Sequence, residues 1–345
     1  MGVFELFAGE YETVSYAHDA SSGLRSIIAV YSTALGPALG GTRFYPFSSE
    51  EAALRDVLRL AKAMAYKASA AGLDLGGGKA VVIGDPRSDK TPELLRAYGR
   101  AVERLGGAYV TTADVGTTSA DMDVIAEATR FVTGTTSGSG DPSRVTAYGV
   151  WHGMKAVAEE LWGDPSLAGK HVAVQGIGKV GSGLVRHLAE DGAQLTIADV
   201  DAAAVSALAA ETGADVVSPD EILAVPCDIL APCALGAVVN DASLPALKTR
   251  AIAGAANNQL ERPEHGEALT EAGILYAPDY VINAGGLINV EDELHGYDEQ
   301  RALGKAAAIA GRLHSVFARA RSEGISTATA ADRIAGDRIR AARAC

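Results

Sequence analysis

The chain contains 345 residues, and its 43 acidic against 30 basic side chains give a formal net charge of −13 and a pI near 5.0. This length allows two domains, each with its own hydrophobic core. The acidic balance excludes nucleic acid and anionic membrane surfaces as natural partners, because both repel negative charge.

Targeting and redox signals are absent from the sequence. We find neither the basic and apolar start of a signal peptide nor an apolar run long enough to cross a bilayer. The three cysteines, Cys227, Cys233 and Cys345, have neither metal-ligand nor disulfide-framework spacing. We therefore expect a cytoplasmic protein without a metal site.

In the N-terminal half, short strands precede and alternate with helices. Turn residues at 19–23 and 36–37 interrupt an alternating apolar pattern, which predicts paired antiparallel strands over residues 10–47. Ser48 and Glu51 have capping-box spacing at the start of a helix that we expect to end near residue 71. The elements expected next are a strand over 79–84, a helix over 91–106, a strand over 109–112 and a helix over 118–128.

The C-terminal half follows a polar, glycine-rich stretch at 135–143, which we interpret as a linker near a hinge. A helix over 146–162 comes next, and strands then alternate with helices. The expected strands are 171–175, 195–198, 229–231, 252–255 and 274–277. This rhythm predicts a parallel, doubly wound sheet, followed by an alanine-rich helical region that Gly324 interrupts.

A dinucleotide-binding fingerprint follows the first of these later strands. Gly176, Gly178 and Gly181 have the G-x-G-x-x-G spacing, with Lys179 and Val180 inside the motif. Glycines at these positions let the backbone approach a pyrophosphate, and the N-terminus of the next helix stabilises its charge. The pattern therefore predicts a nucleotide cofactor.

The choice of nucleotide depends on Asp199, which ends the next strand. A carboxylate at this position accepts hydrogen bonds from the ribose hydroxyls and repels a 2′-phosphate. The sequence has no lysine or arginine between Arg186 and Lys248 that could attract that phosphate. We therefore predict NAD rather than NADP.

Two lysines flank a glycine-rich segment in the N-terminal half. Lys67 lies with Leu60 and Met64 on one stripe of the predicted helix, and Lys79 follows Gly76–Gly78, which we interpret as a turn. A lysine at the end of an apolar stripe is commonly a surface residue. One at the start of a buried strand requires a partner for its charge.

A third polar residue, Asp114, lies just beyond the predicted strand 109–112. Parallel α/β folds place catalytic groups beyond the carboxyl ends of strands, although an aspartate here is also typical of a turn. One lysine can bind a carboxylate and another can act as a base. Together with the fingerprint, these residues indicate an oxidoreductase that acts on an amino acid.

Eight segments, in order along nearly the whole chain, resemble the glutamate/leucine/phenylalanine/valine dehydrogenase superfamily. They are LGGTR at 39–43, MAYK at 64–67, GGGK at 76–79, DVGT at 114–117, TAYGV at 146–150, APCALG at 231–236, AANN at 255–258 and NAGG at 283–286. Among its members, the chain looks most like the leucine and valine enzymes.

The resemblance implies an α/β fold of two domains with a cleft between them. Residues 1–140 would form a mixed-sheet domain for substrate binding, catalysis and oligomerisation, and residues 141–325 a Rossmann domain for NAD. A C-terminal helix at about 325–345 would pack back on the first domain. Members of this superfamily are symmetric oligomers, so we expect a homo-oligomer.

The resemblance also implies a role for each matching residue. Lys67 would bind the substrate carboxylate, Lys79 would activate water, and Asp114 would relay protons to and from the substrate nitrogen. The other implied substrate-site residues are Leu39, Gly40, Gly41, Met64, Asn258, Leu287 and Val290. The residues implied beside the nicotinamide are Thr146, Ala234, Asn257 and Asn283. The reaction would convert an L-amino acid into a 2-oxo acid and ammonia.

The expected substrate side chain is apolar. Glutamate-specific relatives have a lysine where this chain has Leu39 and a serine where it has Val290, so a second carboxylate would be buried without a partner. Leu287 narrows the expected pocket against a phenyl ring. We therefore expect a branched-chain L-amino acid and leave valine against leucine open.

Three alternatives remain on the sequence alone. A phenylalanine dehydrogenase would use the same chemistry in a wider pocket. A non-catalytic NAD-binding regulator could share the fold, but it would need none of Lys67, Lys79 and Asp114. A 2-hydroxy acid dehydrogenase would use a histidine as its acid and base, and none of the seven histidines lies in a recognisable motif.

Overall fold

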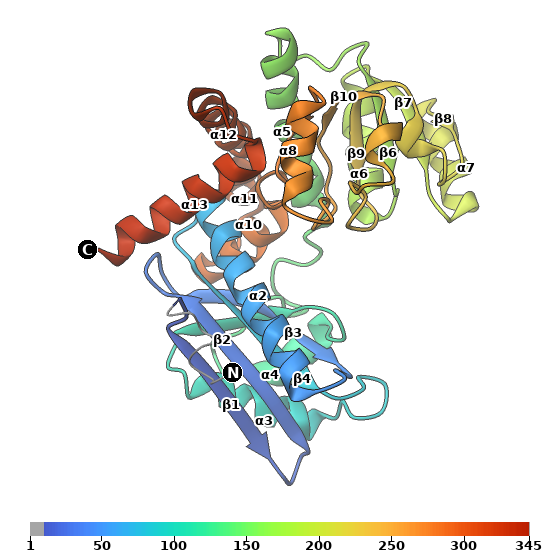
Figure 1. The fold of residues 1–345 in the computed structure, drawn as a ribbon. Helices are drawn as coiled ribbons and strands as arrows, with labels where there is room; N and C mark the ends of the chain where they lie inside the picture. Colours follow the sequence, from blue (N-terminus) through green and yellow to red (C-terminus); the bar gives the residue numbers. More distant parts are fainter. Residues whose placement is uncertain (1–9, 345) are drawn as a thin grey trace. The chain divides into compact units, whose positions relative to one another are not determined.

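The structure, a computed structural model, describes residues 10–344 (Figure 1). The chain divides into two compact units, which we describe separately. The first unit contains the residues up to Gly140, a short return over Val290–Asp298, and the chain from Ala335 onward. The second unit contains Asp141–Asn289 and Glu299–Ile334.

The first unit is built on a mixed five-stranded sheet in the order β1-β2-β4-β3-β5. Its strands are β1 (Thr13–Asp19), β2 (Leu24–Ser32), β3 (Ala38–Tyr45), β4 (Gly76–Ile83) and β5 (Tyr109–Ala113). β2 pairs antiparallel with both β1 and β4, whereas β3 runs parallel to both β4 and β5. The antiparallel prediction for residues 10–47 is therefore wrong for β3, because β4 inserts between β2 and β3.

Three helices cover the two faces of this sheet: α2 (Glu50–Ala70), α3 (Pro92–Glu103) and α4 (Ser119–Ala126). Neighbouring residues of β2 point to opposite faces, so Ile27 packs in the core beneath α2 and Ile28 in the core beneath α3 and α4. Ser49, rather than Ser48, caps α2 and accepts from the backbone N–H of Ala52. The predicted capping box is therefore wrong, because alanine at the third helical position offers no side-chain acceptor for the reciprocal bond.

The glycine-rich segment Gly76–Gly78 is the start of β4 and not the turn that we predicted. A Cβ added to Gly77 would lie 2.1 Å from the backbone nitrogen of Ala65 on α2, and one added to Gly76 would lie 1.9 Å from the carbonyl oxygen of Ser32. These glycines therefore permit close packing of a helix and a neighbouring strand rather than a change of chain direction.

The second unit contains a six-stranded sheet in the order β11-β10-β9-β6-β7-β8, in which every pair is parallel. The strands are β6 (His171–Gln175), β7 (Gln194–Ala198), β8 (Asp215–Val216), β9 (Cys227–Pro232), β10 (Thr249–Ile252) and β11 (Leu275–Tyr276). The strand order reverses between β6 and β9, as in a Rossmann sheet. The predicted doubly wound fold is confirmed, although β10 ends where the predicted strand 252–255 begins.

The helices that follow in the chain flank this sheet or lead back to the first unit. They are α5 (Ser143–Trp162), α6 (Lys179–Glu190), α7 (Ala202–Thr212), α8 (Glu264–Glu271), α9 (Asp279–Ile282), α10 (Gly285–Asp292), α11 (Glu299–Ala307), α12 (Ile309–Glu323) and α13 (Thr327–Arg343), with 3-10 turns η1 (Ile222–Ala224), η2 (Leu244–Ala246) and η3 (Glu293–His295). Gly324, with φ of 64°, ends α12. No helix within residues 10–344 is long and apolar enough to span a membrane.

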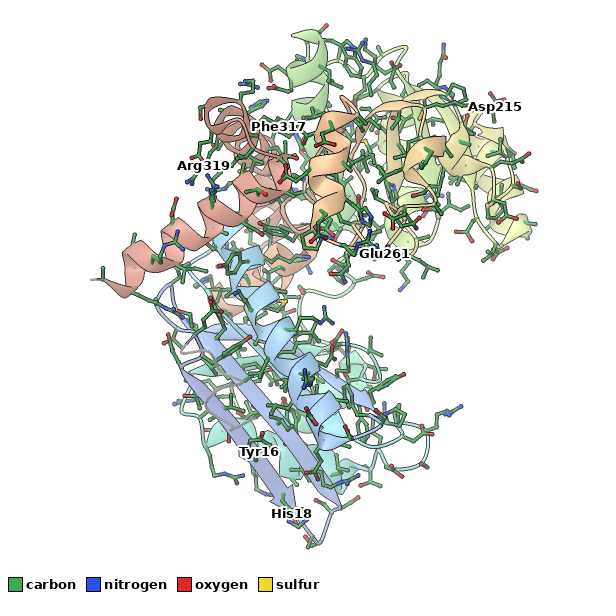
Figure 2. The ribbon with its side chains drawn as sticks, in the orientation of Figure 1. Tyr16, His18, Asp215, Glu261, Phe317 and Arg319 are labelled. Carbon is green, nitrogen blue, oxygen red and sulfur yellow. The ribbon has the colours of Figure 1, made fainter. Side chains whose placement is uncertain are left out.

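The last part of α13 completes the first unit. Ile339 joins the core beneath α2, and Arg338 donates a hydrogen bond of 2.7 Å to the carbonyl of Leu73. Figure 2 labels residues on an edge strand of each sheet. Tyr16 and His18 lie on β1 of the first sheet, and Asp215 lies on β8 of the second.

Candidate active site

Lys79 and Asp114 form an ion pair in the first unit. The Lys79 Nζ atom lies 2.6 Å from Asp114 Oδ2, and the two side chains are 8% and 21% exposed. Lys79 is on β4 and Asp114 follows β5, so the pair reaches across β3, which lies between them. A Cβ on Gly41 of β3 would lie 2.7 Å from Asp114 Cβ and 3.3 Å from Lys79 Nζ. Glycine at position 41 therefore leaves the space in which the two charges meet.

The loop that carries Asp114 is fastened to β3. The Thr117 hydroxyl accepts from the Asp114 backbone N–H at 2.9 Å and lies 2.9 Å from the Thr42 carbonyl, to which it can donate. Gly116 has φ of 81°, and a Cβ there would lie 2.0 Å from the carbonyl oxygen of Phe44. Because the backbone is held on both sides, the main chain of Asp114 has a fixed position from which its side chain extends.

The electrostatic surroundings keep Asp114 ionised. Burial raises the pKa of its carboxyl. The charge and hydrogen bonding of Lys79, followed by the backbone N–H of Val115 and the guanidinium of Arg43, outweigh burial and hold the pKa below its usual value. Arg43 Nε lies 3.5 Å from Asp114 Oδ2, without hydrogen-bond alignment, and Arg43 Nη1 lies 2.8 Å from Asp56 Oδ2. The sequence motif contained Arg43, but nothing in its spacing indicated this contact.

Lys67 and Met64 lie on α2 at the margin of its buried face. Both are half-buried, whereas Ala61, Ala65 and Ala68 are the fully buried residues of this region. The predicted stripe is therefore the border of the helix and not its core-facing side. Lys67 lies in the last turn, where the helix dipole favours a positive charge.

The neighbouring residues of β3 are deeply buried. Leu39 is 1% exposed, and the Gly40 carbonyl accepts a 2.6 Å hydrogen bond from the Tyr109 hydroxyl. A Cβ on Gly40 would lie 1.8 Å from the carbonyl oxygen of Gly78. The backbone of β3 is thus packed tightly beside the Lys79–Asp114 pair.

The return segment 290–298 brings an acidic residue that the sequence analysis missed. Glu293 accepts from the backbone N–H of Gly134 at 2.9 Å and of Ser139 at 2.8 Å, and also from the Ser139 hydroxyl. Val290, a predicted substrate-site residue, lies half-buried at the start of the same segment. Glu293 therefore holds the 134–140 loop, with which the first segment of this unit ends.

In the second unit, each glycine of the fingerprint has a different task. Gly176 has φ of 90°, and Gly181 packs so closely that a Cβ would lie 2.0 Å from the Gly176 carbonyl oxygen. Gly178 caps α6 and is exposed, with nothing within 4 Å of an added Cβ. The exposed helix N-terminus and the open space at Gly178 fit a pyrophosphate.

Asp199 lies at the end of β7 beside this turn. Its Oδ2 accepts from the backbone N–H of Ile177 at 2.7 Å, and its Oδ1 accepts from Asp201 at 3.0 Å. The carboxylate is thereby fixed next to the fingerprint. Lys179, a predicted cofactor residue inside the fingerprint, pairs through its Nζ with Asp141 Oδ2 at 2.7 Å in an exposed position.

The other predicted cofactor residues, and the predicted substrate residues Asn258 and Leu287, lie on loops and helices of the same unit. Asn283 is 4% exposed and donates to Asn257 Oδ1 at 2.8 Å. Asn258 has φ of 51°, and its carbonyl accepts from Ala237, which has φ of 58°. The remaining predicted residues of this unit are Val180 in the first turn of α6, Ala234 just after β9, Thr146 in α5 and Leu287 in α10.

The family follows from two sequence matches that cover most of the chain. Residues 11–131 match the Glu/Leu/Phe/Val dehydrogenase dimerisation domain, and residues 137–205 and 194–343 match the Glutamate/Leucine/Phenylalanine/Valine dehydrogenase domain. The chain belongs to the Glu/Leu/Phe/Val dehydrogenase family. It is an amino acid dehydrogenase, and this family uses NAD or NADP.

Individual relatives cover almost the full length of this family member. It is 53% identical over 337 residues to the leucine dehydrogenase of Geobacillus stearothermophilus, covering 97% of this chain and 92% of that one. It is 51% identical over 351 residues to the valine dehydrogenase of Streptomyces virginiae, with coverage of 99% and 97%. The crystal structure of L-tryptophan dehydrogenase from Nostoc punctiforme matches with a TM-score of 0.92 at 44% identity, covering 99% and 100%.

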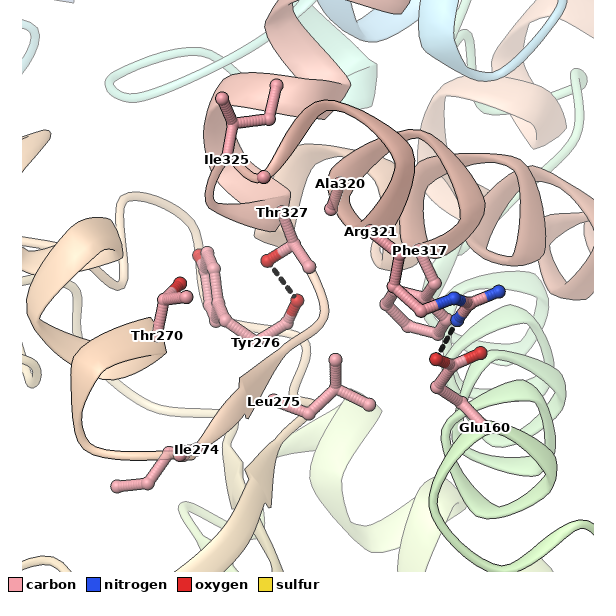
Figure 3. A pocket seen from close by; sticks show the side chains of 12 residues that line it. Glu160, Thr270, Ile274, Leu275, Tyr276, Phe317, Ala320, Arg321, Ile325 and Thr327 are labelled. Atoms are coloured by element: carbon pink, nitrogen blue, oxygen red, sulfur yellow. Dashed lines mark hydrogen bonds and ion pairs between the residues drawn. The ribbon is translucent and has the colours of Figure 1, made fainter.

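A pocket elsewhere in the second unit is separate from these residues. Its volume is about 420 Å³, and the residues drawn around it include Leu275, Tyr276 and Phe317 (Figure 3). An ion pair between Glu160 and Arg321 borders it. None of the residues predicted for the dehydrogenase site lines this pocket.

One group of side chains in the described part of this dehydrogenase has the spacing of metal ligands: Asp241, Glu261 and His265. His265 Nδ1 accepts from the Arg262 backbone N–H at 3.1 Å, so its Nε2 carries the proton and donates to Asp241 at 3.1 Å. The Arg262 guanidinium also bonds both Asp241 oxygens. The three side chains therefore form a hydrogen-bonded cluster in which both ring nitrogens of His265 already have hydrogen-bond partners.

Proposed function

We propose that this enzyme catalyses the reversible, NAD-dependent oxidative deamination of branched-chain L-amino acids to 2-oxo acids and ammonia. The observation that carries the proposal is the Lys79–Asp114 ion pair, at 2.6 Å, in a chain about half identical to leucine and valine dehydrogenases. A buried acid–base pair beside a lysine-bearing helix end suits the binding and deprotonation of an amino acid.

The three polar residues of the first unit divide the work in this proposal. Lys67 binds the substrate carboxylate from the last turn of α2. Lys79 activates the water that attacks the substrate carbon after hydride removal, and Asp114 moves the proton to and from the nitrogen. The fastening of the Asp114 loop to β3 supports this assignment, because a proton carrier must stay within hydrogen-bond distance of its partner.

The second unit supplies the nucleotide side. Gly176, Gly178 and Gly181, with the amide N–H groups at the start of α6, would hold the pyrophosphate, and Asp199 would hold the ribose. A nicotinamide, when bound, accepts the hydride from the substrate Cα. Asn283, whose side chain donates to Asn257, would orient the carboxamide of the nicotinamide. The charge of Asp199 supports NAD over NADP, since it would face the 2′-phosphate.

The apolar residues Leu39, Leu287 and Val290 support an apolar substrate side chain. None of them offers a partner to a second carboxylate, which would cost several kcal/mol if buried alone, on the order of 3–5. The identities of 50–54% to leucine and valine dehydrogenases favour branched-chain substrates over phenylalanine. We further propose a homo-oligomer in the cytoplasm, the first in line with the dimerisation-domain match.

Initial rates with a substrate panel test this function. Valine, leucine, isoleucine, phenylalanine, tryptophan and glutamate are each supplied with NAD and with NADP, and formation of the reduced cofactor is followed. We expect the highest kcat/KM for valine or leucine with NAD. A higher kcat/KM for phenylalanine would contradict the substrate choice, and NAD binding without turnover of any amino acid would indicate a regulator.

The cofactor choice has its own test in Asp199→Asn. This change keeps an oxygen acceptor for the Ile177 N–H and removes the charge that faces a 2′-phosphate. We expect the ratio of kcat/KM with NADP to that with NAD to rise about tenfold, the value of one lost like-charge contact of about 1.4 kcal/mol. An unchanged ratio would show that another residue selects the cofactor.

A further inference from the structure

Arg43 bridges two carboxylates that lie on different elements of the first unit. It extends from β3, with Nη1 2.8 Å from Asp56 Oδ2 on α2 and Nε 3.5 Å from Asp114 Oδ2. Arg43 and Asp56 are 23% and 18% exposed, so water screens this arrangement only partly. The planar guanidinium can span two anions in a fixed geometry, which a flexible ammonium cannot do.

Both cations next to Asp114 approach the same oxygen. Lys79 Nζ and Arg43 Nε lie 2.6 and 3.5 Å from Oδ2. Lys79 comes from β4 and Arg43 from β3, so the carboxylate is held between two strands by opposite charge. An aspartate with a single cationic partner could rotate with that partner, whereas two partners from a rigid sheet fix its direction.

Other charged groups around the Asp114 loop are already paired. Lys90 precedes α3, donates to the Gly116 carbonyl at 3.1 Å and pairs with Asp121 of α4 at 2.7 Å. Asp56 on α2 also pairs with Arg59 at 2.9 Å. Within the described residues, the charged side chains that contact Asp114 itself are therefore Lys79 and Arg43.

We propose that Arg43 is a positioning residue for the reaction, which orients the Asp114 carboxylate toward Lys79 through its charge and its anchor on Asp56. The inference rests on the proposed function, because it serves the same proton-transferring pair. Arg43 itself need not touch the substrate. Its removal withdraws a positive charge from the pair and also frees the carboxylate to turn.

The test is the pH dependence of kcat/KM for leucine in the wild type and in Arg43→Gln. Loss of a nearby positive charge favours protonation of either member of the Lys79–Asp114 pair, so the sign of the change does not depend on which one titrates. We expect the acidic limb of the profile to move to higher pH by about one unit, the lower end of the effect of an adjacent arginine. On that limb, kcat/KM should fall about tenfold at a given pH.

Two further variants separate charge from anchoring. Arg43→Lys keeps the positive charge but loses the planar guanidinium that spans the two carboxylates. Its acidic limb should therefore stay at the wild-type position while kcat falls. Asp56→Asn keeps Arg43 charged and removes its anchor, so its limb should not move to higher pH. If Arg43→Gln does not fold, Arg43→Met removes the same charge and should give the same shift of the acidic limb.

The matched control is Arg59→Gln. Arg59 pairs with the same Asp56 but is 59% exposed, so solvent screens its charge and this change should leave the profile as in the wild type. A merely structural Arg43 would lower kcat/KM equally at every pH, and an unshifted limb in Arg43→Gln would overturn the proposal. So would an upward shift in Asp56→Asn or Arg43→Lys. Absence of any wild-type turnover would instead contradict the proposed function.

Discussion

The two units use glycine in opposite ways. In β4 of the first unit, a Cβ on Gly77 would lie 2.1 Å from the backbone of α2. At the start of α6 in the second unit, Gly178 has open space where a Cβ would stand. The first glycine makes room for the protein itself and brings a lysine-bearing helix close to the sheet. The second leaves room for something that is not protein.

The charged groups of the two units show the same contrast between contacts within the protein and space for a ligand. Lys79 and Asp114 neutralise each other in the interior of the first unit, whereas Asp199 is held by backbone N–H groups beside an exposed turn. A buried pair changes its chemistry when one partner is lost, because the other is left without compensation. Asp199, whose carboxylate is held by backbone N–H groups, chiefly selects which ligand can bind beside it.

The largest expected effect comes from Lys79→Met, which removes the base and leaves the shape of the side chain. We expect kcat/KM to fall by about 10²–10⁴-fold, the usual contribution of a general base. Binding of NAD, followed by fluorescence quenching, should stay near the wild-type value because the nucleotide residues lie in the other unit. A variant with wild-type turnover would remove Lys79 from the mechanism.

Gly77→Ala tests the packed glycine. The new Cβ meets backbone atoms of Ala65, which cannot move aside as a flexible side chain could. We expect the free energy of unfolding to fall by about 3 kcal/mol, as for severe overpacking. Urea denaturation of the variant measures this loss. A change below about 0.5 kcal/mol, typical of an unconstrained surface position, would show that α2 can shift freely.

Gly178→Ala is the matched substitution at the open glycine. Its φ of −59° suits any residue, and no atom lies within 4 Å of the added Cβ. We expect the free energy of unfolding to change by less than about 0.5 kcal/mol. The KM for NAD should nevertheless rise about tenfold or more, because a methyl group would displace the pyrophosphate from the amides. An unchanged KM would place the cofactor elsewhere.

The smallest effect is expected from Glu293→Gln, which weakens the fastening of the 134–140 loop. Charge-assisted hydrogen bonds are worth about 1.5–3 kcal/mol, and a glutamine retains one acceptor oxygen. Hydrogen exchange at Gly134 and Ser139 should therefore accelerate about tenfold. The control is Asp123→Asn, because Asp123 holds the same loop at Thr136 and should affect exchange there instead.

Local sequence rules predicted the second unit better than the first. Strands β6, β7 and β9 have apolar runs followed by turns, and the fingerprint predicted the connection from β6 to α6. The strands of this unit are joined by similar strand–helix–strand crossovers, and such crossovers place successive strands parallel to one another. The short β8 escaped prediction because two exposed residues carry no apolar signal.

The first unit was harder because its partners are distant in sequence. An alternating pattern shows that 38–45 is a strand, but not that β4 separates it from β2. Three consecutive glycines indicate a turn unless a helix packs against them, and that contact exists only in the folded unit. The Lys79–Asp114 contact likewise depends on Gly41 lying between them. The roles assigned to these residues and the domain boundaries expected from the sequence stay predictions.

Because the first unit is assembled from three separated stretches of chain, its folding starts before the second unit is synthesised and is completed only afterwards. Its sheet and α2 are synthesised before the second unit, yet Ile339 and Arg338, which complete the α2 side, follow the second unit in the chain. Until then, the nascent chain leaves apolar surface of α2 uncovered. Translation arrest or truncation before Arg338 would therefore damage the first unit, which holds Lys79, although the break lies beyond the second unit.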